Sequence, residues 1–206
     1  MKFCDWEPYY SEILAYFGFD RQADEEAARL LASLLPADNL ISLVSLTDGN
    51  EVTVCGNAPC LKDDIPKIDG IVFAADAAAE VLEDAGIRPD AIFTDLDGAT
   101  DRFLEMNREG TIIVVHAHGD NMPLLRHWVP QFTGKIVGTT QAAPLPRVYN
   151  FGGFSDGDRA VFAAHELGAE KVTLAGFDLD DPDVDPEKRG KLVWARKLLA
   201  LLGHSV

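Results

Sequence analysis

The chain has few cysteines and no long apolar run. Its three cysteines, Cys4, Cys55 and Cys60, are odd in number and lack the paired spacing of a zinc site, so they argue against a disulfide framework and favour reduced thiols. No segment predicts a membrane span, and the N-terminal stretch "MKFCDWEPYYSEI" is unlike a signal peptide. We therefore expect a cytoplasmic protein.

Basic residues are also scarce: 18 Lys and Arg stand against 34 Asp and Glu, which gives a formal net charge of −16. This charge repels nucleic-acid phosphates and anionic lipids, so we expect neither nucleic acid nor membrane as a partner. A small anionic substrate would need a divalent cation or local donors to hold it. With 206 residues, 47% of them hydrophobic, the chain suits one globular domain with an appendage, folding alone or as a small homo-oligomer.

The pattern of apolar residues changes near residue 39. In residues 1–38, "EPYYSEILAYFGF" and "DEEAARLLASLLP" have helical spacing and predict a helical hairpin that covers an edge or a face of a sheet. In residues 39–206, short β-rich runs alternate with helix-length segments, which predicts an α/β domain with a doubly wound, Rossmann-like, mostly parallel sheet. The "TDGNEV" segment predicts a hairpin, so we expect the sheet to be mixed at that edge. The predicted strands are 41–46, 51–55, 70–73, 91–94, 111–115, 135–138 and 171–175.

Ionisable residues follow most of these strands, at the edge where ligands bind in doubly wound sheets. In "DAIFTDLDGATDRF", Asp95 and Asp97 stand two apart at the end of a strand, so both carboxylates can face one side and hold Mg²⁺. The structural alternative is helix capping by Asp97 or Thr100. Asp76 follows the preceding strand and either joins the pair or caps a helix.

The "HAHGDN" loop places His116, His118, Asp120 and Asn121 together. No further Cys or His completes a zinc site, so we expect its histidines to donate to phosphates or to accept a proton, with one of them structural.

The "NFGGFSDGDRA" segment predicts a glycine-rich entry into a helix, capped by Ser155 and Asp158. A helix start of this kind can cradle an anion, and carboxylates there can pair with an amino-pyrimidine edge. Phe151 or Phe154 could stack on a ring. "GNAPC" is a weaker phosphate-loop candidate, and there is neither a Walker A motif nor a full dinucleotide fingerprint.

Taken together, "AADAAAEVLEDAGIRPDAIFTDLDGA", "VVHAHGDN", "GTTQ", "NFGGFSDGDRAVFAA" and "WEPYYSEILAYFGF" resemble the archaeal 6-hydroxymethyl-7,8-dihydropterin pyrophosphokinases. Residues 86–98 are also distantly similar to thiamine pyrophosphokinase. The resemblance implies transfer of diphosphate from ATP to the hydroxymethyl group of a reduced pterin with release of AMP, and ATP as co-substrate with Mg²⁺.

The resemblance and the loop positions together give each candidate residue an expected role. The metal ligands are Asp95 and Asp97, and the catalytic residues are Asp95, Asp97, His116 and His118. The expected nucleotide-binding residues are Gly56, Asn57, Asp76, Asp120, Asn121, Thr140 and Gln141. The expected substrate-binding residues are Asn150, Gly153, Phe154, Asp156, Asp158 and Arg159. In the C-terminal helix, Lys188 or Lys191 could reach a phosphate.

Three alternatives to pterin pyrophosphokinase remain. A thiamine pyrophosphokinase-like enzyme would use the same carboxylates. A haloacid-dehalogenase-like phosphatase would use Asp95 as a nucleophile, but its lysine is missing, because Lys171 lies at the start of a strand, on the opposite edge of the sheet. A non-catalytic nucleotide- or pterin-binding protein would have little use for two like charges side by side.

Overall fold

The computed structural model describes residues 1–204. The predicted N-terminal hairpin is confirmed as helices α1 (Phe3–Phe17) and α2 (Arg21–Leu34). The strands are β1 (Glu51–Cys55), β2 (Ile71–Ala75), β3 (Ala91–Thr94), β4 (Ile112–Ala117), β5 (Ile136–Thr140), β6 (Val148–Tyr149) and β7 (Lys171–Ala175). The other α-helices are α3 (Leu40–Thr47), α4 (Leu61–Asp64), α5 (Ala78–Asp84), α6 (Asp101–Arg108), α7 (Met122–Trp128), α8 (Asp156–Glu166) and α9 (Pro186–Leu201).

The seven described strands form one sheet in the order β6-β5-β4-β3-β2-β1-β7. Every pairing between them is parallel, so the doubly wound α/β fold is confirmed. The strand order reverses beside β1, which has β2 on one side and β7 on the other. In such sheets the crevice at the reversal is the usual place for a ligand.

The prediction of a strand at 41–46 and of a hairpin after it is wrong. Residues Leu40–Thr47 form helix α3, whose buried Leu43 and Thr47 lie one turn apart. The apolar run "LISLVSL" has no clear period, so the sequence alone does not distinguish a strand from a helix. In the structure it is a helix that packs against the sheet. Gly49 (φ 71°) then follows the end of α3, and its N–H donates to Gly168 O at 2.9 Å. Within residues 1–204, the sheet therefore has no antiparallel strand at that edge.

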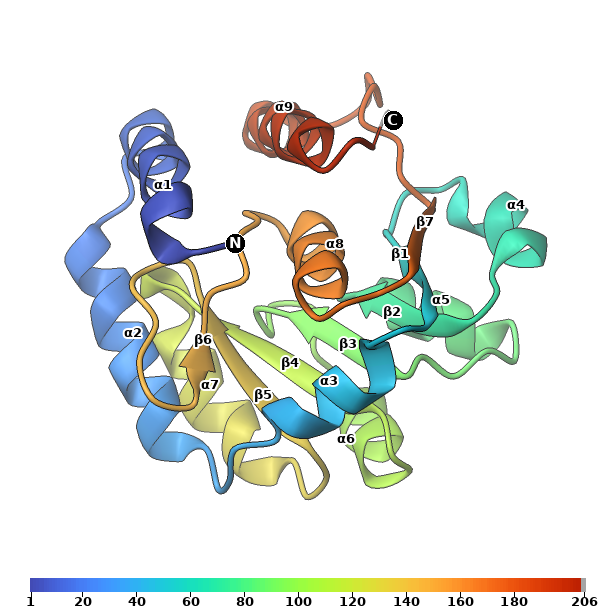
Figure 1. Cartoon of the computed structure of the whole chain (residues 1–206), viewed down its shortest axis with the longest axis horizontal. Helices are drawn as coiled ribbons and strands as arrows, with labels where there is room; N and C mark the ends of the chain where they lie inside the picture. Colours follow the sequence, from blue (N-terminus) through green and yellow to red (C-terminus); the bar gives the residue numbers. More distant parts are fainter. Residues whose placement is uncertain (205–206) are drawn as a thin grey trace.

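Helices cover both faces of the sheet (Figure 1). One face packs under α2, α5, α6 and α7, and its core includes Leu31, Leu82, Phe103 and Leu125. The other face packs under α3 and α8. Figure 1 shows α8 and α9 on the upper side of the sheet and α6 and α7 on the lower side.

The N-terminal hairpin is built into this core. On α1, Trp6, Tyr10 and Ile13 are fully buried against a cluster that includes Phe162 and Trp194 from α8 and α9. The Trp6 indole Nε1 donates to the backbone oxygen of Gln141 at 2.9 Å, which ties α1 to the loop after β5. The helices thus reach the end of the sheet where ligands are expected.

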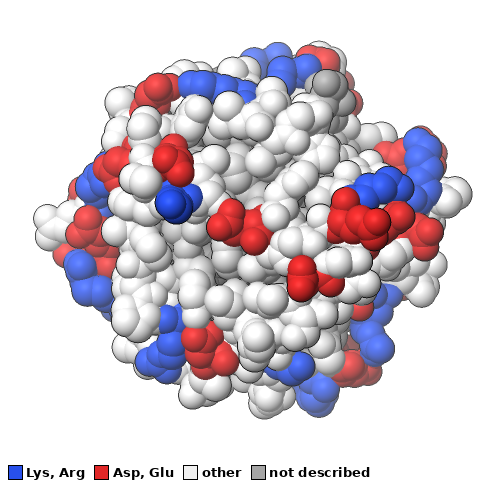
Figure 2. Space-filling view, viewed as in Figure 1, with Lys and Arg blue, Asp and Glu red and all other residues white. Residues whose placement is uncertain are grey.

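The surface is acidic on balance. On the face shown in Figure 2, Lys and Arg occur in small groups beside Asp and Glu. Within residues 1–204, no helix combines the length and the apolar character that a membrane crossing needs.

Candidate active site

A cavity of about 540 Å³ lies at the carboxyl ends of the strands. Residues that follow β1, β2, β3, β4, β5 and β7 line it, together with the start of α8 and one side of α9. At the reversal of strand order, Gly56 and Gly176 are packed so closely that a Cβ on Gly56 would lie 2.6 Å from Gly176 O. The predicted phosphate loop at Gly56 and Asn57 therefore lines the crevice.

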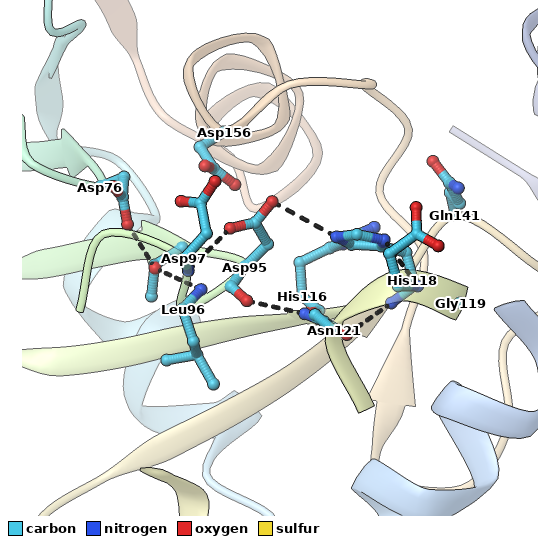
Figure 3. Close-up of polar contacts among 12 residues, drawn as sticks. Asp76, Asp95, Leu96, Asp97, His116, His118, Gly119, Asn121, Gln141 and Asp156 are labelled. Atoms are coloured by element: carbon cyan, nitrogen blue, oxygen red, sulfur yellow. Dashed lines mark hydrogen bonds and ion pairs between the residues drawn. The ribbon is translucent and has the colours of Figure 1, made fainter. Parts of the chain in front are cut away.

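Four acidic side chains from three segments lie close together and line this cavity (Figure 3). Asp76 follows β2, Asp95 and Asp97 follow β3, and Asp156 begins α8. We call these four residues the carboxylate cluster. From the sequence we expect Asp76 to bind the nucleotide and Asp156 to bind the substrate, and the structure brings both beside the predicted metal ligands.

The turn after β3 is strained and tightly held. Leu96 has φ 74° and Asp76 has φ 45°, values that side chains other than glycine rarely adopt. The Thr94 hydroxyl donates to Asp76 Oδ1 at 2.6 Å and accepts the Leu96 N–H at 2.8 Å, so it links the two turns. A Cβ at Gly98 would lie 2.0 Å from Asp76 Oδ2, which explains the glycine of the "DLDG" motif.

His118 orients Asp95. The His118 Nδ1 accepts the Asp120 N–H at 3.4 Å, so the ring proton belongs on Nε2, which donates to Asp95 Oδ2 at 3.3 Å. The Asp97 N–H donates to Asp95 Oδ1 at 3.1 Å. Both oxygens of Asp95 are thus fixed in direction, and neither nitrogen of His118 is free to accept a proton.

Burial, hydrogen bonds and the neighbouring charges give the acids of the cluster different pKa values. Burial acts to raise the pKa of Asp95, but the hydrogen bond from His118 and the charge of Arg159 outweigh it and lower that pKa. Partial burial and the charge of Asp95 raise the pKa of Asp97 to about 6. Burial and the same charge raise the pKa of Asp76 and of Asp156, the latter well above its usual range.

The cluster suits a hard cation that keeps part of its water shell. Among the described residues, no three His, Cys, Asp or Glu side chains are arranged to hold a metal ion by themselves. Mg²⁺ commonly takes only one or two carboxylates, with waters and substrate phosphates as its other ligands. Burial and the neighbouring acids raise the pKa of three of these carboxyls, and a bound cation would oppose that effect. The donor set therefore fits Mg²⁺.

His116 lies beneath the cavity and not on its wall. It is 3% exposed, and its Nδ1 lies 3.1 Å from the Thr139 hydroxyl, which itself donates to Val115 O at 3.1 Å. Nδ1 therefore carries the proton, and Nε2 is buried without a partner in the structure. Burial and the charge of Arg159 lower the pKa of His116 well below its ordinary value, so the ring is neutral.

Several predicted site residues support the loops and do not line the cavity. Asn121 donates from Nδ2 to Asp95 O and to His116 O, both at 2.7 Å. Asn150 donates to Gln141 O and to Ala142 O, both at 2.9 Å. Three more predicted residues have structural contacts of this kind. Thr140 accepts the Ala142 N–H, and Gly153 packs against the Arg159 backbone. Asp158 forms the predicted capping box with Ser155.

Of the predicted helix caps, Thr100 is confirmed and Asp76 is not. Thr100 caps α6, accepting the Arg102 N–H at 3.3 Å. At α5 the cap position is taken by Ala77, so Asp76 does not cap it.

The remaining predicted residues line the cavity: Gly56, Asn57, Asp76, Asp95, Asp97, His118, Asp120, Gln141, Phe154, Asp156 and Arg159. The cavity is also lined by Phe19 from the α1–α2 turn and by Phe177 after β7, which were not among the predicted site residues. A helical hairpin without polar motifs gave no signal for Phe19. For Phe177, the signal was its place in the "GFDLDD" loop directly after a predicted strand.

The cavity has two chemically different ends. At one end, Phe19 and Phe154 stand with ring centroids 6.3 Å apart, near Gln141 and Arg159. We call this the aromatic end. Lys188 and Lys191 of α9 and the loop residues Gly56 and Asn57 line the same cavity, and we call these four residues the lysine end. The carboxylate cluster lines the same cavity.

The fold and the strand-end carboxylates define a Rossmann-like α/β protein with an acidic cavity at the carboxyl ends of its strands. A family model described as "6-hydroxymethylpterin diphosphokinase MptE-like" matches residues 27–184. The chain belongs to this family.

Curated relatives agree with the family assignment. The chain is 39% identical to a 6-hydroxymethyl-7,8-dihydropterin pyrophosphokinase of Methanothermobacter thermautotrophicus, with 94% of this chain and 92% of that one covered. It is 40% identical to the protein of that name from Pyrococcus furiosus, over 100% of this chain and 96% of that one. A third, from Methanocaldococcus jannaschii, is 38% identical over 86% and 80%.

Proposed function

We propose that the protein is a 6-hydroxymethyl-7,8-dihydropterin pyrophosphokinase, with ATP as co-substrate and Mg²⁺ as its metal. The observation that carries the proposal is the carboxylate cluster, which lines one cavity together with aromatic and basic side chains. A flat heterocycle suits the aromatic end, and a triphosphate suits the lysine end and the loop at Gly56. We therefore expect the reacting phosphate to lie beside the cluster.

In the transfer, the hydroxymethyl oxygen of the pterin forms a bond to the β-phosphorus of ATP. The bond between that phosphorus and the oxygen it shares with the α-phosphate breaks, and AMP leaves with that oxygen. The proton of the alcohol passes to a carboxylate of the cluster, because both nitrogens of His118 are engaged and His116 does not reach the cavity wall. In phosphoryl transfer, positioning contributes more than the strength of the base.

Asp95 and Asp97 would hold the Mg²⁺. The ion supplies charge neutralisation for the phosphate oxygens and a template for their orientation. The residues around them fix the geometry in advance: His118 sets the direction of Asp95, and Asn121 pins the backbone of the same turn. Lys191 lies close enough to oppose the raised pKa of Asp97, so its charge also acts on this site.

The activity is tested by incubating the protein with ATP, Mg²⁺ and the reduced hydroxymethylpterin and identifying the nucleotide product. AMP together with a diphosphorylated pterin is the expected result. ADP would indicate an ordinary kinase, and free phosphate without any acceptor would indicate a phosphatase. Neither product is compatible with the proposal.

Thiamine in place of the pterin tests the related pyrophosphokinase reaction. AMP formation with thiamine and not with the pterin would move the substrate assignment to that enzyme. Binding of both ligands with no turnover under any condition would indicate a binding protein. The same assay thus separates all the alternatives.

A further inference from the structure

A buried carboxylate outside the cluster controls a side chain at the aromatic end. Asp24 of α2 is 2% exposed and accepts three hydrogen bonds from the protein. The Tyr10 hydroxyl donates to its Oδ2 at 2.7 Å, the Gln141 amide Nε2 donates to the same oxygen at 2.8 Å, and the Gly119 N–H donates to Oδ1 at 2.8 Å. Asp24 therefore binds only protein groups and joins α1, the loop after β4 and the loop after β5.

The bond to Asp24 decides which way the Gln141 amide faces. A carboxylate only accepts hydrogen bonds, so the amide nitrogen must point to Asp24 and the amide oxygen must point away. The backbone oxygen of Gln141 is held as well, by Trp6 Nε1 and by Asn150 Nδ2, both at 2.9 Å. The side chain thus has little freedom to turn.

The amide oxygen of Gln141 is the group left for a ligand. Gln141 is 3% exposed, and its Oε1 has no hydrogen-bond partner in the structure. A buried acceptor without a donor is unfavourable, so such a group marks a place where a donor is expected to bind. Gln141 lines the main cavity beside Phe154 and also a smaller one, of about 200 Å³, beside Phe19 and Asp24.

The close approach of α2 to the site supports the same reading. A Cβ at Gly119 would lie 2.6 Å from the Cβ of Ala23, so the glycine lets α2 pack directly on the loop that carries His118. The turn before α2 carries Phe19, which forms part of the aromatic end. The hairpin therefore supplies both an aromatic wall and the carboxylate that orients Gln141.

We propose that Asp24 is a positioning residue that orients the Gln141 amide so that its oxygen accepts an N–H from the pyrimidine ring of the pterin. The ring offers such donors in its 2-amino group and its N3–H, and its flat face suits Phe19 and Phe154. This inference rests on the proposed function. It makes Gln141 specific for the pterin, whereas the sequence had placed it with the nucleotide.

Three variants test the inference. Gln141→Leu removes the acceptor and leaves the other two bonds of Asp24 in place. Asp24→Asn keeps the shape and accepts from Gly119, but its amide nitrogen forces Gln141 to turn its own nitrogen toward the cavity. The double variant Asp24→Asn with Gln141→Glu restores an acceptor, since one Glu oxygen pairs with the Asn amide and the other faces the cavity.

Pterin and ATP are titrated separately, by direct binding without the other substrate and by their KM values. Each single variant should raise the Kd and KM for the pterin by about 10- to 100-fold and leave those for ATP within about threefold. The double variant should recover most of the lost pterin affinity. Tyr10→Phe is the matched control, because it removes another bond of Asp24: it should lower the Tm and leave the pterin KM nearly unchanged.

Equal effects on both substrates, a larger effect on ATP, or the absence of recovery in the double variant would overturn the inference. If Asp24→Asn does not fold, Gln141→Leu decides the matter alone, because pterin binding equal to wild type in that variant refutes the role of the amide oxygen. Binding of the pterin is measured without turnover. A wild-type protein that binds the pterin but forms no AMP would refute the proposed activity and leave this test intact.

Discussion

Two sets of carboxylates in this protein differ in what surrounds their oxygens. Asp24 and Asp158 are 2% and 0% exposed, and each accepts three hydrogen bonds from the protein, at two helices that border the site. In the carboxylate cluster, by contrast, the charges face one another and the cavity (Figure 3). Acids of the first kind hold the structure, whereas we propose that acids of the second kind bind a ligand that brings positive charge.

The largest expected effect is on turnover, from changing the cluster itself. Asp95→Asn and Asp97→Asn should each lower kcat by at least about 100-fold, because each removes a charged ligand of the proposed metal. Circular dichroism should show an unchanged fold. Asp101→Asn, which removes an acid from the same segment at the start of α6, is the control and should keep nearly full activity. Turnover near wild type in both cluster variants would remove the metal assignment.

Changing a structural acid should act on stability. Asp158→Ala leaves the N–H groups of Phe154 and Ser155 without their acceptor inside the protein. We expect the free energy of unfolding to fall by about 2–3 kcal/mol, measured by urea denaturation. Asp97→Asn should lower stability much less or raise it, since it relieves repulsion. The contrast between the two sets fails if Asp97→Asn destabilises the protein as much as Asp158→Ala does.

The raised pKa values in the carboxylate cluster should make the stability of the protein depend on pH. The pKa of Asp97 is raised to about 6, so between about pH 4 and pH 6 the folded state binds more protons than the unfolded state. In metal-free protein, stability contributed by this group is therefore lost as the pH rises through 6. Asp76 and Asp156, whose pKa values are also raised, act in the same direction. Asp97 is exposed to the cavity, and solvent screens part of the effect.

Thermal melts with EDTA and with Mg²⁺ check this expectation. The gain in Tm from Mg²⁺ should grow from pH 5 to pH 7, and it should be smaller in Asp97→Asn at pH 7. A gain that is independent of pH, or the same in the variant, would mean that the ion binds elsewhere.

The smallest expected effect is on the KM for ATP, and it tests which substrate binds at which end of the cavity. Lys191 lines the lysine end, where its ammonium group also pairs with Glu187 at 2.9 Å. Lys191→Ala should raise the KM for ATP by about three- to tenfold and leave the KM for the pterin unchanged, because a partly exposed charge contributes about 1 kcal/mol. Lys171→Ala is the control for the loss of one positive charge, because Lys171 begins β7 and the cavity lies beyond the other end of that strand. A change in the pterin KM instead would mean that the two ends are assigned in reverse.

The sequence predicted the sheet well where strands end in polar loops. Residues Ala91–Thr94 and Lys171–Ala175 are strands as predicted, because β-branched and aromatic runs there are bounded by turns. Leu40–Thr47 was missed as a helix, since an apolar segment of eight residues fits either structure until it packs. The two-residue strand β6 is too short to leave a pattern.

In the site, the sequence predicted which loops converge but not which side chains face the ligand. His116 and His118 are two residues apart, yet one is buried beneath the cavity and the other lines it. Asn150 and Asp158 are polar residues of the right kind, but the backbone takes up their hydrogen bonds. Asp24 gave no signal, because its partners are distant in sequence and become neighbours only in the folded chain.

A crystal structure with Mg²⁺ and an ATP analogue whose α,β-bridge cannot be cleaved tests the central claim most directly. The account predicts the ion between the carboxylates of Asp95 and Asp97 and the phosphate oxygens, with the β-phosphorus facing the aromatic end. An ion bound away from these two residues, with the triphosphate ordered elsewhere in the cavity, would contradict it.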